Sequence, residues 1–310
     1  MKIFITGASG FLGKFLSRAL QERGDTVINP SSRVCDLQYP VSLEQFQSER
    51  FDQIYHLAAW TQAGDFCLKH PGEQWLINQK INTNILDWWG KKQPQAKLIA
   101  IGTSCSYDPG SRLKEEEYLS GTPIDSLFTY AMTKRMLLTG LIALQKQFGL
   151  EYLYVIPSTL YGADYHDDGR QMHFIFDVVR KIVRAHLYDE PVILWGDGHQ
   201  KRELIHVADF IDALLQLVKI EKNTWINIGG GEGYSIRHFA KIICKIVGYS
   251  PDKIHYDLTK YVGAKSKVLN VQKLHEILPS FSPRPLNEGL QEVVQWFMEK
   301  NLQCKAALHL

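Results

Sequence analysis

The sequence is poor in several features that define large classes of proteins. Its 310 residues include only five cysteines, scattered without metal-type spacing: Cys35, Cys67, Cys105, Cys244 and Cys304. Neither a disulfide framework nor a metal centre is therefore expected. The net charge of +2 gives no electrostatic basis for binding nucleic acid or a membrane surface. Apolar runs are short and no signal-peptide pattern is present, so a cytoplasmic protein without a membrane span is expected.

A glycine-rich turn follows the first strand pattern. Residues 2–6 form a continuous apolar run of strand length, and a helical pattern extends to residue 20. Gly7, Gly10 and Gly13 have the spacing Gly-x-x-Gly-x-x-Gly at this junction. Such glycines let backbone amides approach a pyrophosphate at the positive end of a helix. We therefore expect a dinucleotide to bind here, with a purely structural tight turn as the alternative.

The expected second strand, residues 25–29, indicates which dinucleotide is bound. A cofactor without a 2′-phosphate usually meets an acidic residue at the end of this strand. The sequence has no acid there but continues to Ser32 and Arg33, whose hydroxyl and guanidinium suit a 2′-phosphate. NADPH is therefore favoured and NADH is the alternative. Asp36 and Leu37 follow, and we expect them near the adenine.

Strands and helices alternate through the first half of the chain. Strand patterns cover residues 53–59, 97–101 and 151–156, and helical patterns cover residues 71–91 and 132–148. This alternation predicts an α/β fold with a Rossmann-type, doubly wound parallel sheet, whose ligands bind at the carboxyl ends of the strands. The residues expected at such ends are Leu57, Ala58, Ala59, Thr103 and Pro157.

The pattern changes after residue 162. A polar insert with Asp167, Asp168 and Arg170 comes first and is expected to cover the site. Further elements are predicted at residues 172–186, 191–195, 224–228, 235–247 and 286–300. We expect residues 1–162 and about 203–228 to form the NADP-binding domain. Residues from about 163 to 202 and from 229 to 310 are expected to form a smaller, mainly C-terminal α/β lobe that binds substrate.

Tyr130 and Lys134 are four residues apart at the start of a helical pattern, so their side chains project from one face of the helix. A phenol beside a fixed ammonium is a proton donor whose pKa the positive charge lowers. Hydride transfer to a ketone needs such a donor, because the oxygen must gain a proton. On its own this spacing is also compatible with surface residues that have no function.

Several motifs together resemble the extended short-chain dehydrogenase/reductases that act on nucleotide sugars. The stretches that carry this resemblance are residues 6–13, 56–59, 103–107, 130–134, 157–162 and 202–207. The cofactor contacts predicted on this basis are Gly7, Ser9, Gly10, Phe11, Leu12, Gly13, Ser32, Arg33, Asp36, Leu37, Leu57, Ala58, Ala59, Tyr130, Lys134, Pro157, Thr159, Leu160 and His173.

Within this family, three stretches are similar to the GDP-L-fucose synthases, which combine 3,5-epimerase and 4-reductase activities. Residues 102–107 resemble their Gly-Ser-Ser-Cys-x-Tyr, residues 158–162 are similar to their Thr-Asn-Leu-Tyr-Gly, and His173 matches their acid/base histidine. The sequence departs from them where Lys260-Tyr261-Val262-Gly263 replaces Lys-Pro-Asp-Gly. That segment helps to shape the sugar-nucleotide pocket, so the resemblance does not fix the sugar.

The resemblance also implies roles for individual residues. Thr103 would hydrogen-bond the ketone, Tyr130 would protonate it, and Lys134 would hold the nicotinamide ribose and lower the phenol pKa. Cys105 and His173 would be the acid and base of epimerisation, as an inversion needs one such group on each face. The alternative for Cys105 is a small buried residue at a strand end. The alternative for His173 is a structural histidine near a helix start whose hydrogen bonds are all made within the protein.

Arg202 is the candidate for clamping a diphosphate through bidentate hydrogen bonds, with a surface ion pair as the alternative. The predicted substrate contacts are Thr103, Ser104, Cys105, Lys181, Trp195 and Arg202.

The partner expected is a nucleotide-diphosphate sugar, with a GDP-linked one favoured. A 4-keto reductase without epimerase activity, acting on a GDP-, CDP- or dTDP-activated deoxy sugar or heptose, is the alternative enzyme. A cofactor-sensing regulator is disfavoured, because the tyrosine–lysine pair is intact.

A homodimer is also expected, because dimers of this family pair two helices that are predicted here. The apolar residues proposed for that face are Ile85, Trp88, Trp89, Leu137, Leu138 and Leu141. The alternative is that these side chains pack only on the sheet of their own chain.

Overall fold

The protein is described by a computed structural model that covers residues 1–166, 168–260 and 263–307, with only the backbone for residues 303–307. Asp167 of the polar insert and the Tyr261-Val262 pair of the altered motif lie outside these residues.

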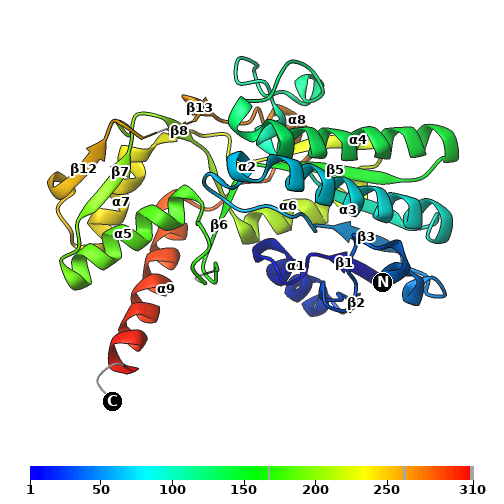
Figure 1. The fold of residues 1–310 in the computed structure, drawn as a ribbon, viewed down its shortest axis with the longest axis horizontal. Coiled ribbons are helices and arrows are strands. Elements are labelled where there is room, and N and C mark those ends of the chain that lie inside the picture. The colour runs from blue at the N-terminus through cyan, green and yellow to red at the C-terminus, as the bar shows by residue number, and fades with distance from the viewer. Residues whose placement is uncertain (167, 261–262, 308–310) are drawn as a thin grey trace.

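A six-stranded parallel sheet forms the centre of the larger body (Figure 1). Its strand order is β10-β5-β4-β3-β1-β2, and every neighbouring pair is parallel. The strands are β1 (Lys2–Thr6), β2 (Thr26–Ile28), β3 (Gln53–His56), β4 (Lys97–Ile101), β5 (Tyr152–Pro157) and β10 (Thr224–Ile228). The chain moves outward from β1 in both directions, so the boundary between β1 and β3 is the switch point at which such sheets bind ligands. The predicted doubly wound sheet is confirmed.

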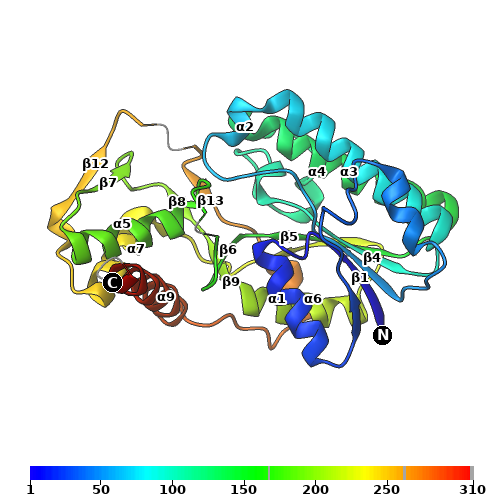
Figure 2. The ribbon, with the colours of Figure 1, turned by 60° about the horizontal axis from the view of Figure 1, so that its bottom comes forward.

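Helices cover both faces of this sheet (Figure 2). Helices α1 (Phe11–Glu22) and α6 (Val207–Ile220) pack together on one face, and α3 (Pro71–Lys92) and α4 (Phe128–Phe148) pack together on the other. Short helices and turns complete this body: η1 (Pro40–Phe46), α2 (Phe66–Lys69), η2 (Ser104–Ser106), η3 (Glu115–Glu117), η4 (Asp125–Leu127) and α8 (Gln272–Ile277).

A smaller body lies beside the carboxyl ends of the sheet strands (Figure 1). Its helices α5 (Phe174–Tyr188), α7 (Ile236–Val247) and α9 (Leu286–Ala307) pack on one another. The pair formed by β6 (Thr159–Tyr161) and β9 (Leu204–His206) lies between the two bodies. Strand β7 (Val192–Trp195) pairs with β12 (Ile254–Asp257) within the smaller body. A three-stranded sheet has the order β11 (Tyr234–Ser235), β8 (Lys201–Arg202) and β13 (Ser266–Lys267), and η5 (Pro251–Lys253) precedes β12.

Two hydrophobic cores correspond to these bodies. The first surrounds the six-stranded sheet, and the second lies among α5, α7 and α9. Leu269, Val271 and Leu274 belong to the first core, although the sequence analysis assigned them to the smaller lobe. The reason is that α8 packs against β10, so the chain returns to the larger body before it enters α9.

The residues proposed for a dimer face are buried within the single chain. Ile85 and Trp88 of α3 and Leu137 and Leu141 of α4 are at most 6% exposed, and Trp89 and Leu138 are equally inaccessible. They pack in the core around the sheet, so the proposed face is wrong and the alternative applies. The exposed apolar side chains of these helices are different ones, among them Leu76 and Met136.

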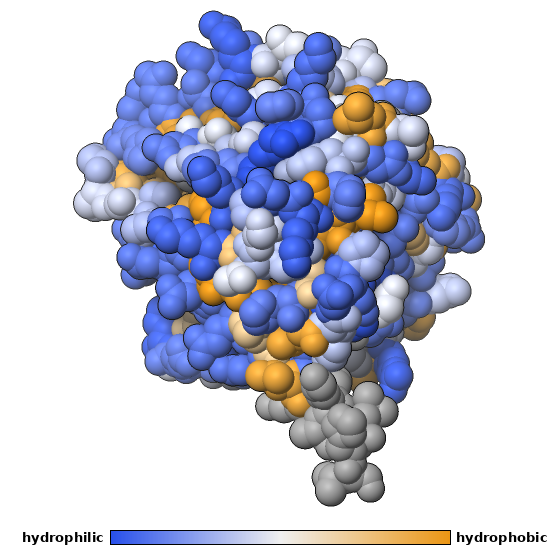
Figure 3. Space-filling model, turned by 90° about the vertical axis from the view of Figure 1, so that its left-hand side faces the viewer, coloured by the Kyte–Doolittle hydropathy of each residue, from blue (hydrophilic) through white to orange (hydrophobic). Residues whose placement is uncertain are grey.

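The surface of the smaller body is mainly hydrophilic. Figure 3 shows hydrophobic residues scattered among polar ones on this side of the molecule. In the part of the chain that the structure describes, no helix has both the length and the apolar character that a membrane crossing requires.

Candidate active site

The glycine turn follows β1 and opens α1, as the sequence predicted. Gly7 has a φ of +72°, and its carbonyl accepts a hydrogen bond from the amide of Gly10 at 3.1 Å. A Cβ on Gly13 would lie 2.5 Å from the Cα of Ala8 and would also collide with the carbonyl of Gly7. Gly10 is the N-cap of α1 and offers no side-chain acceptor to the first amides of the helix. The turn therefore fits a pyrophosphate, because close backbone packing leaves unpaired N–H groups at a helix start.

The turn is fastened to the end of the neighbouring strand. The Oγ1 of Thr6 accepts hydrogen bonds from the amides of Leu57 and Ala58, both at 3.2 Å, and lies 2.9 Å from the Nδ1 of His56. His56 is fully buried and also contacts Asn82. Thr6 therefore joins the ends of β1 and β3 at the switch point of the sheet.

The other predicted cofactor residues lie along the same edge or beside it. Ser9 is exposed in the turn, and Phe11 and Leu12 form the first turn of α1. Phe11 also packs in the core, with its ring 5.1 Å from that of Tyr165. The remaining residues are Ala59 after β3, Pro157 at the end of β5, and Thr159 and Leu160 in β6.

The segment predicted to select the cofactor follows β2. Ser32 and Arg33 are both exposed. The Oδ1 of Asp36 accepts a hydrogen bond from the amide of Gln38 at 3.0 Å, and Leu37 is buried. No hydrogen bond or ion pair to another described residue engages the Arg33 guanidinium, so its donors face solvent and are open to an anion.

Thr103 lies at the end of β4 and caps the turn η2. Its Oγ1 accepts a hydrogen bond from the amide of Cys105 at 3.2 Å, which leaves the hydroxyl proton for another acceptor. The amide of Thr103 donates to the phenol oxygen of Tyr118 at 3.3 Å, and that oxygen lies 2.8 Å from the phenol of Tyr154. These buried phenols hold the end of β4 in place.

Tyr130 and Lys134 both lie on α4, with the Lys134 Nζ 5.9 Å from the centre of the tyrosine ring. The ammonium donates a 2.8 Å hydrogen bond to the carbonyl of Ile101. Desolvation lowers the pKa of Lys134 to about 8. Desolvation also raises the pKa of the Tyr130 phenol, and the neighbouring Cys105 acts in the same direction. The net pKa of the phenol is therefore raised, because loss of solvation is the largest cause of the shift. A lowering of the phenol pKa by the charge of Lys134 stays a prediction.

Cys105 is partly buried in η2, and the Nζ of Lys267 on β13 lies 3.4 Å from its sulfur. Burial favours the neutral thiol, but the charge of Lys267, the contact with Thr103 and the charge of Arg202 together lower the thiol pKa. Cations near a thiol favour the thiolate, which is the reactive form. Ser104 beside it is buried, so its side chain is less accessible than the neighbouring thiol.

His173 immediately precedes α5, and the residue as a whole is exposed although many protein atoms surround its imidazole. Desolvation by the neighbouring protein atoms, the charge of Lys267 and the proximity of His166 lower its pKa to about 4. The imidazole is therefore neutral near pH 7. The polar insert before it reaches the loop ahead of α2, where the amide of Asp65 donates to the Oε1 of Gln171 at 3.1 Å.

Most of the predicted catalytic residues lie close to one another in the structure. Electrostatic interactions link Cys105 with Tyr130 and Arg202 and link Lys267 with His173. Arg202 and Lys267 are register partners on β8 and β13. The side chain of Arg202 donates to the carbonyls of Lys201 and Ala264 at 2.7 and 2.8 Å.

Two predicted substrate contacts are not joined to this group. The ammonium of Lys181 pairs with Asp177 at 2.7 Å and donates to the carbonyl of Ile193. Trp195 is 51% exposed at the end of β7. Within the described residues, no contact connects Lys181 or Trp195 to Cys105 or Tyr130.

Sequence reasoning missed Lys267 and Glu203. Glu203 is 2% exposed, and its carboxylate accepts hydrogen bonds from the amides of Gly231 and Leu269, both at 2.7 Å. Burial raises its pKa to about 7. The only sequence signal was the position of Glu203 within the recognised 202–207 motif, whereas Lys267 carried none.

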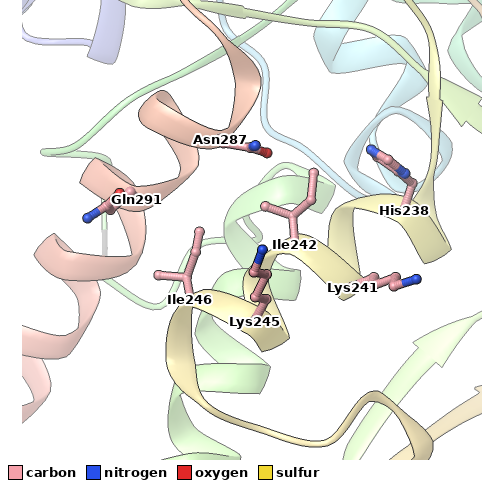
Figure 4. A pocket seen from close by; sticks show the side chains of 7 residues that line it. All are labelled: His238, Lys241, Ile242, Lys245, Ile246, Asn287 and Gln291. Carbon is pink, nitrogen blue, oxygen red and sulfur yellow. The ribbon is translucent and has the colours of Figure 1, made fainter.

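A surface groove elsewhere has no connection with these residues. It has a volume of about 570 Å³ and lies between α7 and α9 (Figure 4). Its lining residues are His238, Lys241, Ile242, Lys245, Ile246, Asn287 and Gln291. None of the predicted site residues lines it.

The parallel sheet, the glycine turn and the tyrosine–lysine pair define a nicotinamide-dependent enzyme of the Rossmann type. Residues 3–229 match the NAD dependent epimerase/dehydratase family, and the chain belongs to that family. The predicted family, enzyme class and nicotinamide cofactor are confirmed.

Relatives that match almost the full chain include several enzymes of known name. The chain is 29% identical to a GDP-L-fucose synthase of Escherichia coli (strain K12), over 96% of this chain and 97% of that protein. It is 30% identical to a GDP-L-colitose synthase of Yersinia pseudotuberculosis, over 97% and 99% of the two chains. It is 27% identical to a dTDP-4-dehydro-6-deoxy-D-allose reductase of Streptomyces sp, over 95% of each.

Solved structures share the fold. A GDP-6-OMe-4-keto-L-xylo-heptose reductase from C. jejuni superimposes with a TM-score of 0.87 at 20% identity, over 97% of this chain and 98% of the other. A GDP-L-fucose synthetase from Naegleria fowleri bound to NADP gives a TM-score of 0.85 at 23% identity, over 97% and 95% of the two chains.

Proposed function

We propose that this protein is an NADPH-dependent enzyme that epimerises a GDP-4-keto-6-deoxy sugar at C3 and C5 and then reduces its C4 ketone. The relatives named GDP-L-fucose synthase and GDP-L-colitose synthase support a substrate of this kind. The observation that carries the proposal is the cation-supported thiol of Cys105, which lies close enough to Tyr130 to raise the phenol pKa. A base for epimerisation and a proton donor for reduction therefore share one location.

The reduction needs two donors directed at one oxygen. The nicotinamide supplies a hydride to C4 when it is bound. Tyr130, whose raised pKa keeps the phenol protonated, gives its proton to O4. The Thr103 hydroxyl hydrogen-bonds the same oxygen while charge develops on it. Arg202 provides the guanidinium for the diphosphate, and the smaller body supplies the surface on which the nucleotide sugar lies.

The epimerisation needs a base next to the carbon that loses a proton. The Cys105 thiolate takes a proton from C3 or C5, and the electron pair of the broken C–H bond moves toward O4 to form an enolate. The hydroxyls of Tyr130 and Thr103 stabilise the negative oxygen. Return of a proton to the opposite face inverts the carbon. His173 is the residue proposed to supply it, from its small imidazolium fraction, and it regains the proton from solvent.

Deuterium uptake tests the epimerase step. Incubation of GDP-4-keto-6-deoxy-D-mannose with the enzyme in heavy water, without reductant, should place deuterium at C3 and C5. The Cys105→Ser variant should lose this exchange and keep measurable ketone reduction with NADPH. Full exchange in Cys105→Ser would refute the role assigned to the thiol. Cys244→Ser, which alters a buried cysteine of the smaller body, is the matched control and should exchange normally.

One observation favours a second candidate, a 4-keto reductase that does not epimerise. The pKa of His173 is lowered to about 4, and a neutral imidazole is a poor acid near pH 7. A relative named dTDP-4-dehydro-6-deoxy-D-allose reductase is consistent with such an activity on a differently activated deoxy sugar. Absence of solvent deuterium from C3 and C5 of the reduced product would select this candidate, because simple reduction leaves both carbons untouched.

A homodimer remains part of the proposal, with a changed surface. The exposed Leu76 on α3 and Met136 on α4 are 60% and 43% accessible, so they replace the buried residues of the earlier expectation. Light scattering at micromolar concentration should give twice the mass of one chain, and Leu76→Asp should lower it. A monomer at that concentration would refute the dimer.

A further inference from the structure

Lys267 and Cys105 are 162 positions apart in the sequence, and their side chains meet at 3.4 Å. The lysine side chain is only partly exposed. In the described parts of the chain, Lys267 forms no ion pair with a carboxylate, although its charge interacts with the buried Glu203. The thiol is therefore its direct side-chain partner. An ammonium at this distance from a sulfur stabilises the negative thiolate over the neutral thiol.

The backbone around Lys267 is fixed on both sides. Strand β13 pairs with β8 in parallel register, Lys267 beside Arg202, and the amide of Lys201 donates to the carbonyl of Lys265 at 2.8 Å. Two residues beyond Lys267, the amide of Leu269 donates to the buried carboxylate of Glu203 at 2.7 Å. The lysine is thus carried on an anchored segment.

We propose that Lys267 is a positioning residue that increases the thiolate fraction of Cys105 through direct contact between its ammonium and the sulfur. This role deepens the epimerase activity proposed above and rests on it, because the thiolate is the base of that reaction. The same ammonium also favours the neutral form of His173. One cation therefore favours the thiolate of Cys105 and disfavours the imidazolium form of His173.

The other groups that face the thiol lower its pKa less than Lys267 does, or carry no charge near pH 7. Arg202 on β8 adds a second positive charge, and the hydroxyl of Thr103 hydrogen-bonds the thiol. Cys67 on α2 and Tyr130 on α4 also interact electrostatically with Cys105. Both are neutral near pH 7, because their own pKa values are raised by burial. Among these groups, the charge of Lys267 is the largest contribution that lowers the thiol pKa.

The rate of alkylation of Cys105 by iodoacetamide tests the proposal without substrate or cofactor. Only the thiolate reacts, so the rate against pH reports its ionisation, and mass spectrometry of the modified peptide separates Cys105 from the other cysteines. In Lys267→Met the rate at pH 7 should fall about tenfold or more, as expected when a cation within 4 Å is removed. Lys267→Arg should retain most of the rate.

A matched variant controls for general loss of positive charge. Lys265 is exposed on the same segment, and Lys265→Met should alkylate like the wild type. The far-ultraviolet circular dichroism and NADPH affinity of each variant check that it is folded. An unchanged alkylation profile in folded Lys267→Met would overturn the proposal, as would an equal loss of rate in Lys265→Met.

The same variants separate this proposal from the epimerase activity on which it rests. If the enzyme epimerises, Lys267→Met should lose deuterium exchange at C3 and C5 by the same factor as its alkylation rate at that pH. Slower alkylation in an enzyme that never exchanges would uphold the contact and refute the epimerase. Normal exchange with slow alkylation would overturn the role assigned to Lys267.

Discussion

The ammonium of Lys134 lies 5.9 Å from the centre of the Tyr130 ring and donates a 2.8 Å hydrogen bond to the carbonyl of Ile101. Ile101 is the last residue of β4, and Thr103 follows two positions later. The hydrogen bond therefore joins helix α4, which carries Tyr130, to the end of strand β4, which Thr103 follows. In the proposed mechanism, this connection determines where the ketone oxygen is received.

Ketone reduction should decline as the pH rises through about 8. The pKa of Lys134 is lowered to about 8, so its ammonium is charged below that pH and neutral above it. The charge supports the phenolate that remains after Tyr130 has given up its proton. The pH profile of kcat/KM, which reports groups of the free enzyme, should fall with a midpoint near this value. A profile that stays level well above it would contradict the assignment.

Adding one methyl group to the glycine turn should impair cofactor binding. In Gly13→Ala the new Cβ would lie 2.5 Å from the Cα of Ala8, so the turn must shift. Such overpacking costs about 1–3 kcal/mol of stability, and the NADPH dissociation constant should rise about tenfold or more. Gly72→Ala is the control, because a Cβ there meets no atom within 4 Å. Calorimetric titration that finds equal affinities in the two variants would exclude a cofactor role for this turn.

Arg33 should determine the preference for NADPH. Its guanidinium is exposed after β2, and hydrogen bonds to a charged group contribute about 1.5–3 kcal/mol. Arg33→Ala should therefore lower kcat/KM for NADPH about tenfold to a hundredfold and leave that for NADH nearly unchanged. Arg50→Ala, at another exposed arginine of the larger body, should change neither. Equal losses with both cofactors in Arg33→Ala would show that no 2′-phosphate is bound there.

Glu203 should make the protein less stable as the pH rises from about 4.5 to 7. Burial raises its pKa from 4.5 to about 7, so the folded state holds this proton more tightly than the unfolded state. Its contribution to stability is complete below pH 4.5 and is lost as the pH rises through 7. The loss amounts to about 3 kcal/mol.

Denaturant titration of the wild type and of Glu203→Gln measures this effect. The glutamine cannot ionise, so the difference in unfolding free energy between the two proteins should change across this pH range. Curves that remain parallel would show that Glu203 keeps an ordinary pKa in the folded protein.

The sheet and the positions of most candidate site residues could be predicted because their signals are local. Apolar runs marked the central strands, and β4 and β10 have the predicted bounds. Helix α4 begins at Phe128, four positions before the predicted start, because its N-cap Leu127 offers no side-chain cap. The sequence therefore contained no start signal there, although Tyr130 and Lys134 were correctly placed on one helix.

The remaining features depend on contacts between distant segments. Strands β8 and β13 contain two residues each, too few for any periodicity, so the approach of Lys267 to Cys105 had no sequence signal. The raised pKa of Tyr130 follows from desolvation by tertiary packing, which a spacing of four residues does not reveal. Burial of Trp89 and Leu138 in their own core is likewise a property of the assembled sheet.

The transfer of a proton from Tyr130 to the ketone is the central claim, and turnover of Tyr130→Phe tests it most directly. With GDP-4-keto-6-deoxy-D-mannose and NADPH, the loss of reduced-nicotinamide absorbance should slow about 10²- to 10⁴-fold, while NADPH still binds. Tyr39→Phe, at an exposed tyrosine, should turn over normally. Turnover of Tyr130→Phe at the wild-type rate would contradict the proposed mechanism.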